Sequence, residues 1–159
     1  CKFAAENNLR IGFYGGENES LDKCISNLKN EYEELIVSYA YSPPFRILTN
    51  EEKKEIIDNI NNSKTEILFV CLGCPKQEYW MAEHKDYLKC ISFGVGEVVD
   101  LISGLKKLTP KWIVKIGMRW LTRLIGEPRK LFWRYFSTNF KFIYLFSKQY
   151  FRYKIYKKN

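Results

Sequence analysis

The segment "CLGCPKQEYW" (71–80) holds the chain's only C-x-x-C pair, and two chemical uses of that pair can be weighed. A redox pair needs a nucleophilic thiolate at a helix N-terminus, whereas Cys71 falls inside an apolar run that has the pattern of a strand. A zinc site needs about four ligands, and the other candidates, His84 and Cys90, lie within the next helix and at the next strand. We therefore predict a core position for Cys71, a loop position for Cys74 and no metal site.

The same segment joins a strand to a helix, and this joint is the better candidate for a binding site. The strand ends near Gly73, and the helix is predicted to begin at Pro75, whose missing N–H costs nothing in a first turn. Free backbone N–H groups and the positive end of the helix dipole favour a phosphate or a sugar carboxylate there. The first turn carries Lys76, Gln77 and Glu78. The Gln77 amide can donate and accept, as recognition of a base or sugar requires, while Glu78 could simply complement the dipole.

Strands and helices alternate around this joint. Apolar runs closed by turn residues predict strands at residues 9–16, 36–41, 66–72 and 90–96. Helical spacing predicts helices at about 20–35, at 51–62 behind a Thr49–Glu52 capping box, and at 75–88. The run at 66–72 is typical of a parallel strand covered on both faces. The fold class is therefore α/β, with an open, mostly parallel Rossmann-like sheet and helices on both faces.

Two further strand ends carry glycine, in "GFYGGEN" and "FGVGE". Each motif alone is weak evidence, because turns use glycine for positive φ in any case. Such sheets bind ligands beyond the carboxyl ends of their strands, so three glycine ends at one edge favour a binding site there.

Charge and aromatic residues divide the chain near Gly104. Residues 1–104 carry 11 Lys/Arg and 17 Asp/Glu, whereas residues 105–159 carry 15 Lys/Arg and a single acid. Fourteen of the 26 aromatic residues lie in the second part. We therefore expect a sheet domain at 1–104 and a basic, aromatic, helical appendage at 105–159.

The appendage is predicted to be purely helical, with a break at Gly126 and Pro128. Basic residues recur at every fourth position of its first helix: Lys111, Lys115, Arg119 and Arg123. Such a ladder is repulsive unless an anion meets it. Basic residues interleaved with Trp, Tyr and Phe favour docking to an anionic membrane surface. The alternative is a solvated helix pair that packs its aromatic residues on the sheet domain.

Five scattered cysteines without a secretion signal argue against a disulfide framework. No signal peptide and no run of about 18 apolar residues is present, so we expect a cytoplasmic location. The chain opens on Cys1, and "CKFAAENNLRIGFYGG" has the pattern of a helix end leading into a strand, which predicts a fragment of a longer protein.

Six segments, in their order and spacing, resemble the WecG/TagA/CpsF family of bacterial glycosyltransferases. They cover about residues 9–135: "FYGG" before a helix, "AYSPPFRILTNEE", "ILFVCLGCPKQEYWM", "FGVGEVVD", "SGLKKLTPKW" and "IGMRWLTRLIGEPRKLFWRY". The resemblance implies an inverting enzyme that transfers an N-acetylmannosamine-type sugar, an N-acetylhexosamine or its uronic acid, from a UDP donor. The implied acceptor is a polyprenyl-diphosphate-linked saccharide at the inner face of the cell membrane. Family products are teichoic acid linkage units, enterobacterial common antigen and capsular or exopolysaccharides.

Carried over residue by residue, the resemblance assigns nucleotide-sugar binding to eight positions: Tyr41, Gly73, Lys76, Gln77, Glu78, Gly94, Gly96 and Asp100. The first glycine-closed strand end adds Gly15 and Gly16. Diphosphate binding is assigned to four positions of the appendage, which is thought to fold over the active site: Arg123, Arg129, Lys130 and Arg134. Arginine forks suit phosphate oxygens, so this cluster would neutralise the leaving UDP without a metal or other cofactor.

Several residues depart from the family pattern. Glu97 places a negative side chain near the expected pyrophosphate, "KLTP" replaces K-R-A-P, and Arg119 stands where an acid is common. The family's N-terminal half, with an aspartate proposed as general base, is absent from this sequence. Inversion requires a base, so the catalytic residues are unknown and this chain alone is expected to be catalytically incomplete.

Two alternatives to the enzyme follow from the same residues. One is a catalytically inactive remnant that binds a partner chain, a possibility to which Glu97 and the missing base point. The other is a nucleic-acid-binding module built on residues 105–159, because basic and aromatic residues also suit single strands. Nucleic acid is the less favoured partner, since it leaves PKQE and the glycine ends unexplained; a homo-oligomer is compatible with the sequence.

Overall fold

The computed structural model describes residues 1–106, 109–126 and 128–156. Within these ranges the description leaves out the side chains of residues 154–156 and of Lys111, Arg119, Arg123, Lys130, Arg134 and Phe151. The chain divides into two compact units, residues 1–107 and 108–159, and each is considered by itself.

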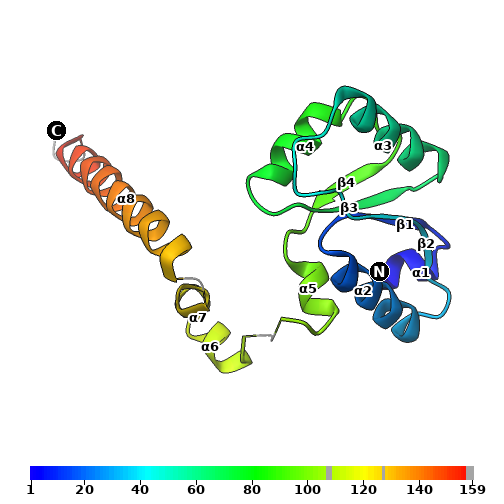
Figure 1. Ribbon diagram of the computed structural model, residues 1–159. Helices are drawn as coiled ribbons and strands as arrows, with labels where there is room; N and C mark the ends of the chain where they lie inside the picture. Colours follow the sequence, from blue (N-terminus) through cyan, green and yellow to red (C-terminus); the bar gives the residue numbers. More distant parts are fainter. Residues whose placement is uncertain (107–108, 127, 157–159) are drawn as a thin grey trace. The chain divides into compact units, whose positions relative to one another are not determined.

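The first unit is built on a four-stranded parallel sheet with the strand order β2-β1-β3-β4 (Figure 1). Its strands are β1 (Arg10–Gly15), β2 (Ile36–Tyr41), β3 (Ile67–Cys71) and β4 (Ile91–Gly94). Its helices are α1 (Lys2–Glu6), α2 (Asn18–Glu31), α3 (Asn50–Asn62), α4 (Lys76–His84) and α5 (Val98–Ile102). The predicted α/β class and parallel sheet are confirmed.

Helices cover both faces of this sheet. Helices α1, α2 and α5 lie on one face and α3 and α4 on the other (Figure 1). The first core cluster joins Phe13 of β1 to Ala5, Leu21 and Val99, one from each of the three helices. The second core cluster packs apolar residues of α3 and α4 against the opposite side of the strands: Tyr14, Ile56, Ile57, Ile60, Leu68, Val70 and Trp80.

Local sequence signals account for the starts of α3 and α4. Helix α3 has the predicted capping box: the Glu52 N–H donates to Thr49 Oγ1 at 3.2 Å, and the Thr49 N–H donates to Glu52 Oε2 at 2.8 Å. Helix α4 has Pro75 as its N-cap and ends at His84, short of the predicted residue 88. The N–H groups of Tyr87 and Leu88 both donate to the His84 carbonyl, which closes the helix in a turn.

Strand β3 is covered on one face and only partly covered on the other, so the prediction of full cover is wrong. Leu68 and Val70 are buried under α3 and α4, whereas Ile67 and Phe69, on the opposite face, are half-buried. Their partners on β4 are more open: Ile91 is 65% exposed and Phe93 50% exposed. Helix α5 is only five residues long and packs on α2, which leaves this area open. We call Ile67, Phe69, Ile91 and Phe93 the β3–β4 patch.

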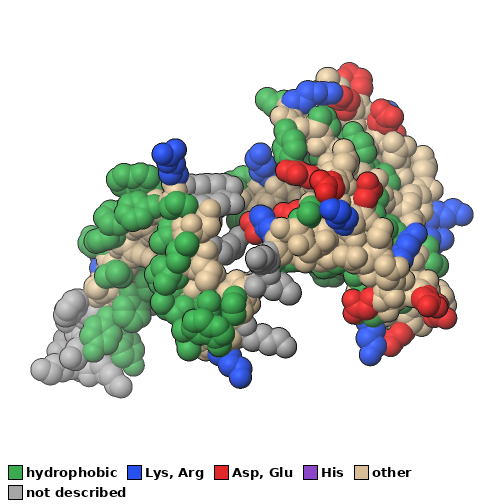
Figure 2. Space-filling model, turned by 60° about the horizontal axis from the view of Figure 1, so that its bottom comes forward, with side chains coloured by type: hydrophobic (Ala, Val, Ile, Leu, Met, Phe, Trp, Pro, Cys, Tyr) green, Lys and Arg blue, Asp and Glu red, His purple; other side chains and the backbone are tan. Residues whose placement is uncertain are grey.

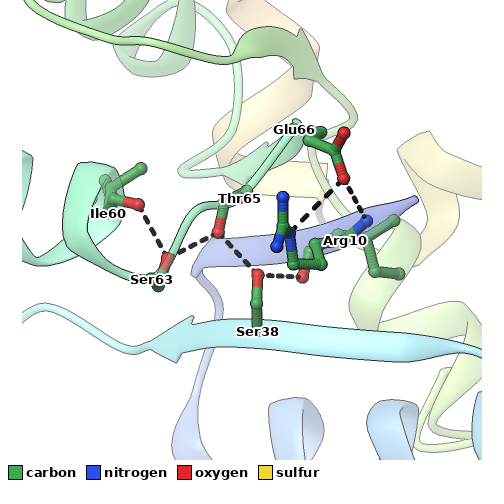
Figure 3. A network of polar contacts seen from close by, with 7 residues as sticks. Arg10, Ser38, Ile60, Ser63, Thr65 and Glu66 are labelled. Carbon is green, nitrogen blue, oxygen red and sulfur yellow. Dashed lines mark hydrogen bonds and ion pairs between the residues drawn. The ribbon is translucent and has the colours of Figure 1, made fainter. Parts of the chain in front are cut away.

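A polar network ties the amino ends of the strands together (Figure 3). Thr65 Oγ1 lies 2.8 Å from Ser38 Oγ and 2.7 Å from Ser63 Oγ, and Ser38 Oγ donates to the Ile11 carbonyl. The Arg10 N–H donates to Glu66 Oε2 at 2.9 Å, and Arg10 Nε lies 3.4 Å from the same oxygen. Because this network lies at the edge opposite the carboxyl ends, we assign it a structural role.

The second unit contains α6 (Lys111–Lys115), α7 (Arg119–Gly126) and α8 (Pro128–Tyr156). The predicted boundary at Gly126 and Pro128 is confirmed, but a further break separates α6 from α7. It falls at Gly117, whose φ of +73° is one that a helix cannot adopt. The predicted four-rung basic ladder is therefore divided between two helices. None of the described helices is both long and apolar enough to cross a membrane.

Candidate functional site

The carboxyl ends of all four strands meet at one edge, where the chain changes direction around β1. From β1 the chain passes through α2 to β2 on one side, and from β2 it returns through α3 to β3 on the other side. The turns after β1 and β3 therefore flank the topological switch point, the place where doubly wound sheets bind ligands. Gly15, Gly16 and Gly73 lie in these two turns, all with positive φ.

Gly15 is required by close packing as well as by its backbone angle. A Cβ atom at this position would lie 2.8 Å from the backbone carbon of Cys71, in a φ of +106°. Backbone atoms cannot move aside, so the end of β1 must be glycine for the two turns to lie next to each other. The structure thus brings the predicted glycines Gly15, Gly16 and Gly73 to neighbouring strand ends.

Gln77 links the turn before α4 to the turn after β4. Its side chain is buried, its Oε1 accepts the Gly96 N–H at 2.9 Å, and its Nε2 donates to Glu78 Oε1 at 3.0 Å. A Cβ on Gly94 would come within 2.8 Å of Gln77 Nε2, so glycine there admits the buried amide. The structure therefore brings Gln77, Glu78, Gly94 and Gly96 into one cluster, with the amide hydrogen-bonded inside the protein.

Lys76 and Glu78 are exposed in the first turn of α4. Gln77 lies between them in sequence and points inward, as the 3.6-residue period of a helix dictates. A cationic ammonium and a carboxylate thus flank the helix N-terminus on its solvent side. They could contact a ligand without any rearrangement of the core.

Asp100 and Glu97 share a lysine at the start of α5. Lys106 Nζ lies 3.6 Å from Asp100 Oδ2 and 3.6 Å from Glu97 Oε2. The Glu97 charge is thus partly offset from within the chain. Asp100 also raises the pKa of the buried thiols of Cys24 and Cys71, although burial is the larger cause for both.

Tyr41 stands at the end of β2 and is 38% exposed. Its ring stacks on Tyr14 at a centroid distance of 6.3 Å, and Tyr14 in turn stacks on Trp80 at 4.5 Å. Burial raises the pKa of Tyr14 to about 12, so its hydroxyl is neutral at physiological pH. The next residue, Ser42, donates a hydrogen bond to the Gly16 carbonyl, which fixes the SPPF loop beside the first glycine turn.

The cysteines of the C-x-x-C pair have different environments, as predicted. Cys71 is buried in β3, and burial raises the pKa of its thiol to about 12, whereas Cys74 is exposed in the turn. A protonated, buried thiol is a poor nucleophile. All five cysteines lie in the described part of the chain, and all are free thiols. Among the described residues, no group of three or more His, Cys, Asp or Glu side chains is placed to hold a metal ion.

The four basic positions of the appendage lie on α7 and α8. Arg129 is exposed near the start of α8. The side chains of Arg123, Lys130 and Arg134 lie outside the described part of the structure. Hydrophobic side chains gather over this unit, and acidic ones over the first unit (Figure 2).

Three features of the first unit have no counterpart in the sequence-based prediction. Trp80 stacks on His84 at 4.8 Å, and His84 Nδ1 lies 2.7 Å from the Trp80 carbonyl, so the only histidine is a buried helix residue. The Ser42–Gly16 and Lys106–Asp100 contacts were also not foreseen. The i, i+4 spacing of Trp80 and His84 was visible in the sequence, whereas the other contacts join distant segments.

The fold and the turns together define a doubly wound, Rossmann-like α/β protein with glycine turns at its switch point. The chain belongs to the glycosyl transferase WecG/TagA/CpsF family, whose model matches residues 1–156.

Two relatives are named for their activity. The chain is 26% identical over 133 residues to the N-acetylglucosaminyldiphosphoundecaprenol N-acetyl-beta-D-mannosaminyltransferase of Bacillus subtilis (strain 168), covering 83% of this chain and 48% of that protein. It is 25% identical over 132 residues to the protein of the same name in Bacillus spizizenii, covering 82% of this chain and 49% of that protein. The chain thus spans about half the length of these relatives.

Proposed function

We propose that this chain is the donor-binding part of a glycosyltransferase that uses a UDP-sugar. The donor carries an N-acetylmannosamine-type sugar, and the acceptor is a saccharide linked to a polyprenyl diphosphate. Family membership and the names of both Bacillus relatives support a transferase with this kind of acceptor. The product belongs to teichoic acid or another cell-surface polysaccharide.

The observation that carries the proposal is the group of turns at the switch point. Gly15, Gly16 and Gly73 flank it, and the exposed Lys76 and Glu78 stand at the N-terminus of α4 beside it. Helix N-termini next to glycine turns stabilise phosphate groups through backbone N–H groups and the helix dipole. A nucleoside diphosphate has the negative charge and the length to lie along such an edge.

In this proposal Gln77 is a positioning residue rather than a direct sugar ligand. Its amide holds the Gly96 N–H and the Glu78 carboxylate, so it fixes the first turn of α4, which lies beside the donor, to the turn after β4. The ammonium of Lys76 is free to contact the diphosphate.

The chemical step is an inverting displacement. An acceptor hydroxyl attacks the anomeric carbon as its bond to the UDP oxygen breaks, and a general base takes the hydroxyl proton. The basic residues Arg123, Arg129, Lys130 and Arg134 neutralise the leaving diphosphate, so no metal is required. The base is expected from residues beyond this sequence, so the chain alone binds donor with little turnover.

The second unit docks the enzyme to the cytoplasmic face of the membrane, where the acceptor resides. On α8 the exposed cations Lys141, Lys148 and Arg152 recur at intervals of seven and four residues and so share one stripe. Exposed aromatic residues such as Phe146 and Tyr150, whose rings stack, lie on the opposite side of the helix. Such helices lie in the interfacial plane of anionic bilayers.

A thermal-shift titration of the chain tests the proposal. UDP should raise the unfolding temperature in a saturable manner, and uridine, which lacks the diphosphate, should do so much less. If neither UDP nor a UDP-sugar stabilises the chain, even when it is extended at its N-terminus, the proposal is wrong. Steeply salt-dependent RNA binding without vesicle binding would favour the nucleic-acid-binding alternative.

A further inference from the structure

The first unit has one sheet edge that is both unpaired and apolar. Strand β4 is an edge strand, and Ile91 and Phe93 on it are 65% and 50% exposed. The Ile91 N–H donates to the carbonyl of Glu66, the residue just before β3. Because successive amides of a strand point to opposite sides, those of Ser92 and Gly94 point to the free edge. An unpaired edge strand that exposes apolar side chains is a template for another strand.

The handedness of the strand–helix–strand connections in this sheet determines which further strand can pair with the free edge of β4. The step from β1 to β2 passes through α2, and α1 lies on the same face as α2 and leads directly into β1. Strand-helix-strand connections between parallel strands are right-handed in nearly all proteins. A parallel strand that reaches β1 through α1 must therefore lie on the side of β1 away from β2. Strands β3 and β4 already occupy that side, so the first free position is beyond β4.

The same connection accounts for the exposed apolar side chains. A chain that runs from beyond β4 to α1 must cross over β4 and β3 on the α1–α2 face. The β3–β4 patch lies on that face, because the rings of Phe13, Phe69 and Phe93 contact one another in a row across the strands. One strand placement thus pairs the free edge and covers the patch.

We propose that the β4 edge and the β3–β4 patch form the docking surface for a further α/β segment, which adds a parallel strand beside β4. The Bacillus relatives are about twice as long as the matched region, so they have residues for such a segment. The proposed occupant is the counterpart of the part of these relatives that has no match in this chain.

Docking also completes the candidate site. The carboxyl end of the added strand lies next to Gly94 and Gly96, the turn held by Gln77. Residues that follow the added strand would then lie beside the donor. A general base supplied by the docked segment would have to lie at this place. This consequence rests on the proposed function, whereas the docking surface rests on topology and exposure alone.

The test uses residues 1–159 mixed with the part of the Bacillus subtilis relative that has no counterpart in this chain, produced as a separate polypeptide. Amide exchange by NMR should slow roughly tenfold or more at Ser92 and Gly94, and it should not change along β2, the opposite edge. The double variant Ile91→Lys/Phe93→Lys should abolish co-elution. Ile36→Lys on β2, where the side chain is 42% exposed, is the matched control and should leave co-elution intact.

Several outcomes overturn the inference. The first two are absence of co-elution and unchanged co-elution of the double lysine variant. The other two concern amide exchange: slower exchange at β2 instead of β4, and slow exchange at β4 in the chain alone because of self-association. Circular dichroism of both variants verifies their fold, and Phe93→Ser replaces the double variant if that one unfolds. UDP thermal shifts of the same samples separate the two proposals, because docking without a UDP effect contradicts only the proposed function.

Discussion

At the scale of single residues, Gln77 has the most constrained side chain of the candidate site. Its amide joins the N-terminus of α4 to the Gly96 turn, and the absence of a side chain at Gly94 makes room for it. This hydrogen bond is part-buried, so removal of the amide leaves the Gly96 N–H without its protein partner and affects both turns at once.

Gln77→Ala should lower the free energy of unfolding by about 1–3 kcal/mol, because the Gly96 N–H loses its partner. The UDP-induced thermal shift should also decrease clearly, since the first turn of α4, which lies beside the donor, is no longer fixed to the turn after β4. Chemical unfolding and a UDP titration measure the two effects. Cys74→Ala, three residues away and exposed, is the control and should change neither. A loss of UDP binding in Cys74→Ala but not in Gln77→Ala would instead assign the functional role to the C-x-x-C pair.

Gly94→Ala should destabilise the chain by about 1–3 kcal/mol, since its Cβ would approach Gln77 Nε2 to 2.8 Å and Met81 Cε to 2.9 Å. The loss should be smaller in a Gln77→Ala background, where the short side chain leaves space. The free energies of unfolding of the two single variants and the double variant, measured with denaturant, give the interaction energy between Gln77 and Gly94. Simple additivity would show that Gln77 and Gly94 do not interact.

Alkylation should distinguish the two cysteines of the C-x-x-C pair. Cys74 is exposed and should react with iodoacetamide at pH 8, whereas Cys71, whose thiol pKa burial raises to about 12, should react only after unfolding. Peptide mass spectrometry of native and urea-treated samples provides the measurement. Early modification of Cys71 would contradict its assignment to the core.

At the scale of elements, the loop between β2 and α3 is fixed at both ends. Ser42 bonds to the Gly16 carbonyl at the start, and the Thr49–Glu52 capping box closes the end. Arg46 also forms a two-pronged ion pair with Glu52, so this glutamate serves both the loop and the helix.

This double use of Glu52 predicts a pH dependence. The hydrogen bond from Arg46 is the main cause that lowers the pKa of Glu52 from 4.5 to about 2. A lowered pKa in the folded state means that the contribution to stability is complete above about pH 4.5 and is lost as the pH falls towards 2. The unfolding temperature of Glu52→Gln should therefore lie below that of the unchanged chain at pH 7, and the two should converge near pH 2. A constant difference across this range would exclude the ion pair as its source.

At the scale of the whole molecule, charge and aromatic residues are divided between the two units. The acidic first unit contains the sheet, and the second carries the exposed aromatic residues of α8. An acceptor linked to a lipid must be met at a membrane, so the division matches the proposed function.

Vesicle sedimentation tests whether the second unit binds anionic membranes. Residues 1–159 should bind vesicles containing phosphatidylglycerol more strongly than pure phosphatidylcholine vesicles, with the preference decreasing in high salt. Lys141→Gln/Lys148→Gln should reduce the preference, and Phe140→Ser should weaken binding to both. Lys29→Gln/Lys85→Gln, two exposed lysines of the first unit, is the matched control and should have no effect. Equal losses in both lysine pairs would contradict docking through α8.

The sequence by itself determined the four strands and the three longer helices α2, α3 and α4 of the first unit, because their signals are local. Helical spacing, the Thr49–Glu52 box and the glycine ends depend on residues a few positions apart, and the class of fold follows from their alternation. The core position of Cys71 and the family could be predicted for the same reason, since both depend on short continuous motifs.

Only the tertiary structure decided what depends on contacts between distant segments. The Gly96 partner of Gln77 lies 19 residues further along the chain, and the Lys106 that meets Glu97 and Asp100 belongs to the loop after α5. The continuous apolar run of β3 predicted cover on both faces, yet whether a face is covered depends on which strands and helices lie beside it. The open β3–β4 patch arises from strand order and from the short α5, which no local pattern encodes.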